Sequence, residues 1–228
     1  MSETASPPEA VTGVPLKGIV VVAHGGQEVS TKPTTAVQPA VLRMVPIARA
    51  IGNALSDAEI RVLRPRFTVR GWNEDAASPV GDLVAVLDGI RARYGSTVPV
   101  TLVGHSMGAR AALRAAGHPS VRAVAALAPW VPPGEPVAQL SGRRVLLAHG
   151  DRDKITRPRD TWAFAERARE VTQVTAIEVS ADGHAMLRRA GLWHALAAEF
   201  ARASFGVAAG EERLAAAVRD TGPGRVTV

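Results

Sequence analysis

Cysteine is absent from the 228-residue sequence, which rules out disulfide bonds, thiolate metal ligands and a cysteine nucleophile. No stretch of about 18 consecutive apolar residues occurs, so no transmembrane helix is expected. The metalloprotease pattern H-E-x-x-H and the phosphate-binding P-loop are also missing. We therefore expect neither a metal ion nor another cofactor.

The amino-terminal stretch Met1–Pro15 lacks the basic start and the apolar core of a signal peptide. Its prolines and acidic residues predict a disordered leader over residues 1–15. Since neither a signal peptide nor a membrane-spanning segment is recognised, we expect a cytoplasmic location and no membrane partner.

Lysine is scarce, although the formal net charge is +6. The basic residues are almost all arginines, and they are scattered in tracts no longer than a pair such as Arg143-Arg144. A nucleic-acid-binding surface requires basic residues gathered on one face, whereas scattered charges indicate a solvated surface. We therefore expect no nucleic-acid partner.

Apolar, β-type runs alternate with segments of helical character along the chain. The predicted strands are Gly18–Ala23, Ile60–Phe67, Val98–Val103, Val121–Leu127, Val145–Ala148 and Val174–Val179. The predicted helices are Pro39–Leu55, Val80–Tyr94, Met107–Ala116, Pro158–Val171 and Met186–Ser204. This alternation predicts an α/β fold: a doubly wound, mostly parallel sheet of about six strands with helices on both faces.

These elements form one predicted domain over residues 16–205. Residues 206–228 are expected to be a loosely attached tail with a short helix over Glu211–Val218 and a frayed end. The proline-rich connection Pro129–Gly142 is too short for a helical lid. We therefore expect at most a minimal cap over the carboxyl edge of the sheet, where ligands bind in folds of this class.

The pentapeptide Gly104-His105-Ser106-Met107-Gly108 reads G-x-S-x-G between a predicted strand and a predicted helix. In that context the motif is typical of a nucleophile elbow, a sharp turn that exposes the serine hydroxyl. Glycine on both sides of Ser106 permits the close backbone approach that such a turn needs. Ser106 is therefore the candidate nucleophile.

A serine hydroxyl becomes nucleophilic only beside a base that a third group orients. His184 lies in the loop after the last predicted strand and is the candidate base. Asp151 and Asp153 both follow the preceding predicted strand, and either could orient the imidazole. Asp182 is close to His184 in sequence, but its expected role is to shape an Asp-Gly turn.

Four motifs in this order resemble the α/β-hydrolase superfamily over roughly Gly18 to Phe205. They are H-G-G at residues 24–26, G-H-S-M-G at 104–108, H-G-x-x-D at 149–153 and G-H at 183–184. Small lidless bacterial members are also similar at Arg70-Gly71-Trp72-Asn73 and Ala128-Pro129-Trp130. The resemblance implies an α/β-hydrolase fold and favours Asp153 over Asp151 as the acid, because Asp153 lies three residues after Gly150.

An oxyanion intermediate needs preorganised N–H donors, and one comes from the residue after the nucleophile, here Met107. The resemblance implies that Gly26 supplies the second donor, with Gln27 as a neighbouring alternative. Gly25, Gln27, Trp72 and Trp130 are candidate substrate-pocket residues. For both tryptophans, burial as packing residues is the alternative.

The combined reading is a serine hydrolase that cleaves a carboxylic ester or thioester through an acyl-enzyme at Ser106. A serine at the elbow indicates acyl chemistry, whereas relatives with an aspartate there hydrolyse haloalkanes or epoxides. The alternatives are an acyltransferase or cyclising thioesterase with the same three residues, and a non-catalytic small-molecule binding protein on this scaffold. The expected partner is a small-molecule acyl substrate.

Overall fold

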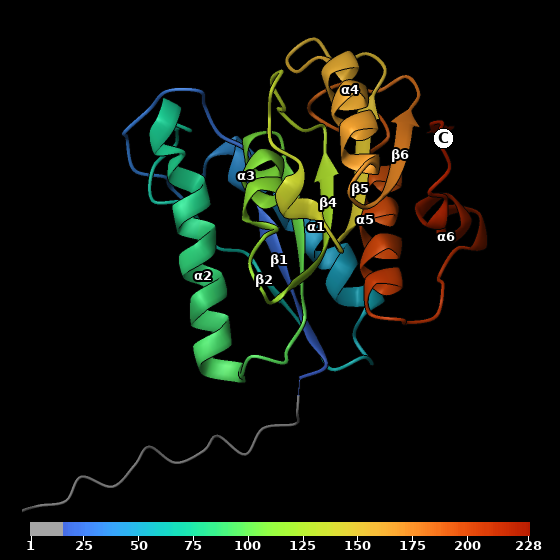
Figure 1. Ribbon diagram of the computed structural model, residues 1–228, viewed down its shortest axis with the longest axis horizontal. Helices are drawn as coiled ribbons and strands as arrows, with labels where there is room; N and C mark the ends of the chain where they lie inside the picture. Colours follow the sequence, from blue (N-terminus) through green and yellow to red (C-terminus); the bar gives the residue numbers. More distant parts are fainter. Residues whose placement is uncertain (1–15) are drawn as a thin grey trace, which may run out of the picture.

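The strands form a single seven-stranded sheet in the order β2-β1-β3-β4-β5-β6-β7, and every neighbouring pair is parallel. The computed structural model describes residues 16–228, so the leader predicted over residues 1–15 lies outside the described residues. The strands are β1 (Gly18–Ala23), β2 (Ile60–Leu63), β3 (Val100–His105), β4 (Val121–Leu127), β5 (Arg144–Gly150), β6 (Gln173–Val179) and β7 (Val226–Thr227). Figure 1 shows the strands side by side, with helices in front of and behind them.

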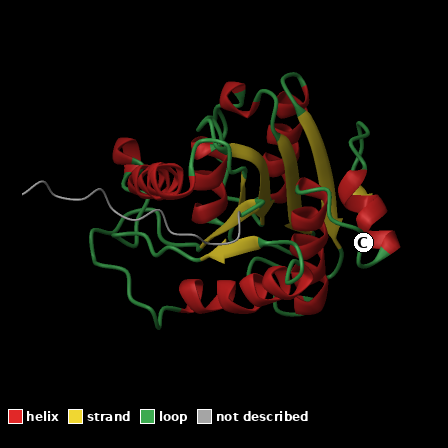
Figure 2. Cartoon of the chain, turned by 90° about the horizontal axis from the view of Figure 1, so that it is seen from below, coloured by secondary structure: helices red, strands yellow, loops and turns green. Residues whose placement is uncertain are grey.

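Helices cover both faces of the sheet (Figure 2). The helices are α1 (Pro39–Ala54), α2 (Ser78–Tyr94), α3 (Met107–Ala115), α4 (Pro158–Arg169), α5 (Ala190–Ser204) and α6 (Glu212–Arg219). Alternate residues of β1 belong to different cores, because side chains along a strand point to opposite faces. Ile19 and Val21 pack with α2, α3 and α4, whereas Val20 and Val22 pack with α1, α5 and α6.

This arrangement confirms the predicted doubly wound α/β fold. The connection between β4 and β5 contains only the short 3₁₀ turn Ala138–Leu140, so no helical cap covers the carboxyl edge of the sheet. Within residues 16–228, no helix is both long and apolar enough to span a bilayer.

Two strands differ from their predicted bounds, and both differences lie next to a proline. The run predicted over Ile60–Phe67 pairs only as far as Leu63, two residues before Pro65. The strand predicted from Val98 begins at Val100, directly after Pro99, and continues through His105. Proline has no N–H to donate, so Pro99 limits β3, which is paired on both sides, whereas β2 is an edge strand paired only with β1.

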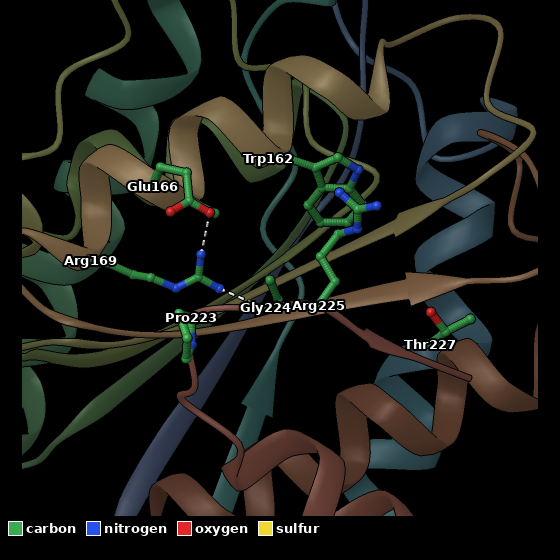
Figure 3. Close-up of a pocket in the computed structure, with 9 residues that line it drawn as sticks. Trp162, Glu166, Arg169, Pro223, Gly224, Arg225 and Thr227 are labelled. Atoms are coloured by element: carbon green, nitrogen blue, oxygen red, sulfur yellow. Dashed lines mark hydrogen bonds and ion pairs between the residues drawn. The ribbon is translucent and has the colours of Figure 1, made fainter.

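The carboxyl-terminal segment is part of the packed domain, which differs from the frayed end that the sequence predicts. In α6, Leu214 and Val218 are buried against the core of α1 and α5. The short strand β7 then pairs with β6, where Val226 lies opposite Ile177. Figure 3 shows how this segment is held against α4: Arg169 donates to the carbonyl of Gly224, and the Arg225 guanidinium lies over Trp162.

Candidate active site

Ser106 occupies a strained turn between β3 and α3. Its backbone angles are φ 54° and ψ −120°, a conformation that residues other than glycine rarely adopt. A Cβ on Gly104 would collide with the Gly108 carbonyl, and one on Gly108 would collide with the carbonyl of His24. The two glycines therefore let β1, β3 and α3 approach closely enough to form the turn.

The structure brings Ser106, His184 and Asp153 together in one hydrogen-bonded chain. Nε2 of His184 is 2.9 Å from Oγ of Ser106. On the other side of the ring, Nδ1 is 2.8 Å from Oδ2 of Asp153. Ionised Asp153 can only accept, so Nδ1 carries the proton and Nε2 is free to accept from the serine hydroxyl.

The carboxylate of Asp153 is buried and accepts five hydrogen bonds. Oδ1 accepts from the backbone N–H groups of Ile155 and Thr156. Oδ2 accepts from His184, from the Thr156 hydroxyl at 2.9 Å and from Nε2 of His149 at 3.0 Å. Burial acts to raise the pKa of Asp153, but the bonds from His149, His184 and Thr156 outweigh it and hold the pKa well below its usual range.

His149 is itself fixed by Thr161, whose hydroxyl is 2.7 Å from Nδ1. Because Nε2 of His149 donates to Asp153, Nδ1 is the acceptor and the Thr161 hydroxyl is the donor. Asp151, the competing acid, is exposed, and its N–H binds the carbonyl of Val179. The sequence spacing allowed either acid to orient His184. In the structure, Asp153 contacts the His184 ring and Asp151 faces solvent.

His105 and Asp182 hold the loop that carries His184. His105 donates from Nε2 to the carbonyl oxygen of His184 at 2.9 Å. Burial, together with the nearby charge of His184, lowers the pKa of His105 to about 3. Asp182 accepts from the backbone N–H groups of Gly183 and Arg189 and from the indole of Trp193. Asp182 therefore shapes the turn, as predicted, and also anchors the start of α5.

The loop after β1 lies against the turn at Ser106. His24 fixes this loop. Its Nδ1 donates a hydrogen bond to the carbonyl of Gly25, and its Nε2 accepts one from the N–H of Phe67. A Cβ on Gly26 would collide with the backbone carbonyl of Arg70 as well as with the end of the Met107 side chain, so glycine is required at this position. The Met107 N–H lies at the first position of α3, where it has no intrahelical partner.

Gln27 and Gly26 differ in what their N–H groups do. The Gln27 N–H is bound to the carbonyl of Arg70 at 2.8 Å and is not available to a substrate. Within residues 16–228, the N–H of Gly26 makes no recorded hydrogen bond. Of the two candidate donors in this loop, Gly26 is therefore the one whose N–H the fold does not use within residues 16–228.

Trp72 and Trp130 line a cavity of about 360 Å³ beside this loop, with Glu28 and Arg110. Trp72 is buried, so it both packs in the core and lines the cavity. Trp130 is half-buried and lines the same cavity. The guanidinium of Arg110 lies over both rings, 3.9 Å from the centroid of Trp72 and 4.5 Å from that of Trp130. Gly25 lies against the Ser106 turn rather than in this cavity.

Sequence reasoning missed the threonines that orient the acid and its neighbouring imidazole. Thr156 could have been recognised, because an aspartate followed two and three residues later by free N–H groups forms an Asx-type turn. Thr161 lies one helical turn inside α4 and carries no local signal. Within residues 16–228, no cluster of three or more histidine, aspartate or glutamate side chains is arranged to hold a metal ion.

Comparison with known proteins agrees with the fold described above. A family model described as the alpha/beta hydrolase family matches residues 20–226, almost the whole of the described chain. The chain belongs to the alpha/beta hydrolase family. The match includes α6 and ends at Val226, the first residue of β7.

Solved structures with the same fold include a lidless α/β serine hydrolase from Xanthomonas campestris, at 21% identity and a TM-score of 0.58, covering 86% of this chain and 84% of that chain. An α/β serine hydrolase homologue from Coxiella burnetii aligns at 19% identity and a TM-score of 0.59, covering 82% and 86%. Est1E from Butyrivibrio proteoclasticus, solved with ferulic acid, aligns at 14% identity and a TM-score of 0.61, covering 86% and 93%. Among curated proteins, no sequence matches this hydrolase.

Proposed function

We propose that this hydrolase cleaves a carboxylic ester or thioester of a small-molecule substrate through an acyl-enzyme at Ser106. The observation that carries the proposal is the continuous hydrogen-bonded chain from Ser106 Oγ through His184 to the buried Asp153 carboxylate. The membership of the alpha/beta hydrolase family supports a hydrolytic activity. A strained backbone turn is costly, and binding alone does not require a serine hydroxyl placed beside a base.

In the first half of the reaction, Ser106 Oγ attacks the acyl carbon while Nε2 of His184 takes the hydroxyl proton. Asp153 keeps Nδ1 protonated and stabilises the imidazolium that forms. As the tetrahedral intermediate collapses, His184 returns the proton to the leaving alcohol or thiol, and the acyl group stays on Ser106. Water then attacks this acyl-enzyme by the same proton transfers and releases the acid.

The negative oxygen of each intermediate needs donors that are already in place. The N–H groups of Met107 and Gly26 are the proposed pair, because Met107 follows Ser106, Gly26 follows Gly25 at the Ser106 turn, and neither N–H is used by the fold within residues 16–228. In other enzymes, loss of one such donor costs about 3–4 kcal/mol of transition-state stabilisation.

Hydrolysis is favoured over acyl transfer because, within residues 16–228, the connection between β4 and β5 carries no helical lid. The connection after β4 is short, and without a cap water can reach an acyl group on Ser106. The Est1E structure that shares this fold was solved with ferulic acid, a carboxylic acid, which agrees with acyl chemistry on this scaffold.

The test is turnover of 4-nitrophenyl butyrate and of a butyryl thioester by the wild type and by Ser106→Ala. We expect Ser106→Ala to lose at least about 10³-fold in kcat, since the nucleophile is absent. Its melting temperature should stay close to that of the wild type. The exposed Ser56→Ala is the matched control and should retain full activity.

Covalent labelling with a fluorophosphonate identifies the nucleophile independently of the ester chosen. We expect the label on Ser106 in the wild type and no label in Ser106→Ala. Activity that survives in Ser106→Ala, or a label on another residue, would remove the basis of the proposal.

A further inference from the structure

A groove between α1 and α5 opens beside the loop that carries His184. It has a volume of about 260 Å³. We call it the α1–α5 groove, and its walls include Pro39, Arg43, Ile47, Met186, Trp193 and His194. Apart from Arg43 and His194, these walls are apolar.

Arg43 is the unusual member of this groove. Within residues 16–228, its guanidinium makes no recorded ion pair or hydrogen bond, and its Nε atom is buried without a partner. Arg43 is half-buried, and this burial lowers its pKa. By contrast, Arg110, which lines the cavity beside Trp72 and Trp130, forms an ion pair with Glu135 at 2.7 Å.

The α1–α5 groove is close to the candidate catalytic residues. Met186 follows His184 by two residues and lies in the groove wall. The positive charge of Arg43 also contributes to the lowered pKa of His105, whose ring contacts that of His184 with 4.9 Å between centroids. A ligand held in the groove would therefore extend from the side of the His184 loop.

The mouth of the groove is apolar as well. Leu187 is part of the groove wall and is 69% exposed, and Leu42, which precedes Arg43 in α1, is 50% exposed. Exposed leucines beside an apolar groove favour an apolar ligand chain, because contact removes their surface from water. The groove thus offers an apolar path and one uncompensated positive charge.

We propose that the α1–α5 groove binds the acyl part of the substrate, and that Arg43 pairs with a carboxylate at the far end of that acyl chain. The guanidinium fork matches a carboxylate in a two-bond arrangement. One unpaired arginine balances one negative charge, which fits a monocarboxylate better than a phosphate monoester with nearly two charges. This inference rests on the proposed esterase function and names its substrate class: monoesters or monothioesters of apolar dicarboxylic acids.

The activity test compares two esters of equal chain length. Mono-4-nitrophenyl adipate carries a terminal carboxylate, and 4-nitrophenyl hexanoate ends in a methyl group. The readout is the ratio of their kcat/KM values. We expect this ratio to fall at least tenfold in Arg43→Met, which keeps a long apolar side chain but removes the charge.

The matched control is Arg49→Met, because Arg49 is exposed on the same helix. Its ratio should stay within about twofold of the wild type, since bulk charge on α1 is reduced equally. A ratio that is unchanged in Arg43→Met, or equally lowered in Arg49→Met, overturns the assignment. So does an equal loss on both esters in a folded Arg43→Met protein.

A binding test separates this inference from the proposed function. In Ser106→Ala, calorimetry compares monomethyl adipate, which has one carboxylate, with the neutral dimethyl adipate. We expect at least tenfold tighter binding of the monoester and loss of that preference when Arg43→Met is added. If the wild type cleaves no ester, the proposed function fails while this preference still decides the inference; if the preference is absent, the inference fails whatever the activity.

Discussion

At the scale of single residues, the environment of Asp153 distinguishes it from Asp151. Asp153 is buried and accepts hydrogen bonds at both carboxylate oxygens, whereas Asp151 is exposed to solvent. An acid that must fix one tautomer of His184 needs this rigidity, since a solvated carboxylate would leave the ring free to turn.

Replacing Asp153 by asparagine should therefore be far more damaging than the same change at Asp151. The amide nitrogen would face Nδ1 of His184 as a donor and favour the wrong tautomer, so we expect kcat to fall by about 10³–10⁴. Asp151→Asn should stay within twofold. The check is steady-state turnover of 4-nitrophenyl butyrate by both variants, and similar losses in the two would contradict the assignment.

At the scale of elements, the turn between β3 and α3 depends on how closely β1 approaches it. A Cβ at Gly108 would collide with the backbone of Ala23 and His24, which cannot move without disturbing the central sheet. Gly89 is also helical, in α2, but a Cβ there would meet nothing within 4 Å. The same glycine-to-alanine substitution at these two positions therefore compares a tightly packed site with an open one.

We expect Gly108→Ala and Gly89→Ala to change stability in opposite directions. Gly89→Ala should stabilise the protein by about 0.5–1 kcal/mol, because alanine loses less backbone entropy in a helix. Gly108→Ala should destabilise it by at least about 1–3 kcal/mol, the usual cost of overpacking. Urea unfolding measures both, and a stable, active Gly108→Ala protein would show that the turn is not tightly packed.

Elements whose sequence signal lies within a few residues could be predicted. Element bounds that depend on contacts between distant residues could not. Ser106 was found from its glycines and from the strand and helix around it. The start of α5 was not: the helical pattern predicts Met186, but the helix begins at Ala190. Met186 has φ 55° and Asp182 binds the N–H of Arg189, so a side chain from the preceding turn determines where the helix starts.

At the scale of the whole molecule, the parallel sheet gathers the site from distant parts of the chain. Ser106 follows β3, Asp153 follows β5 and His184 follows β6, and the carboxyl ends of these strands lie at one edge. The alternating pattern of the sequence predicts this convergence. It does not predict the unpaired charge of Arg43, because pairing depends on which acids the fold brings near.

Because His105 is buried, the free energy of unfolding of the whole domain depends on pH. The pKa of His105 is about 3 in the folded protein and about 6.5 when exposed, so the unfolded state binds the proton first as pH falls. The stability that this group contributes is therefore fully present above about pH 6.5 and is lost as the pH falls toward 3.

We expect the unfolding free energy of the wild type to decrease with falling pH between 6 and 4 more steeply than that of His105→Gln. One proton bound only by the unfolded state corresponds to about 1.4 kcal/mol per pH unit, and this is the expected difference in slope. Glutamine keeps an amide N–H that can reach the carbonyl of His184, and a comparison at pH 8 removes any effect unrelated to titration. Equal slopes in urea unfolding across this range would mean that His105 takes up its proton in the folded state, and that the loop carrying His184 adapts to the charge.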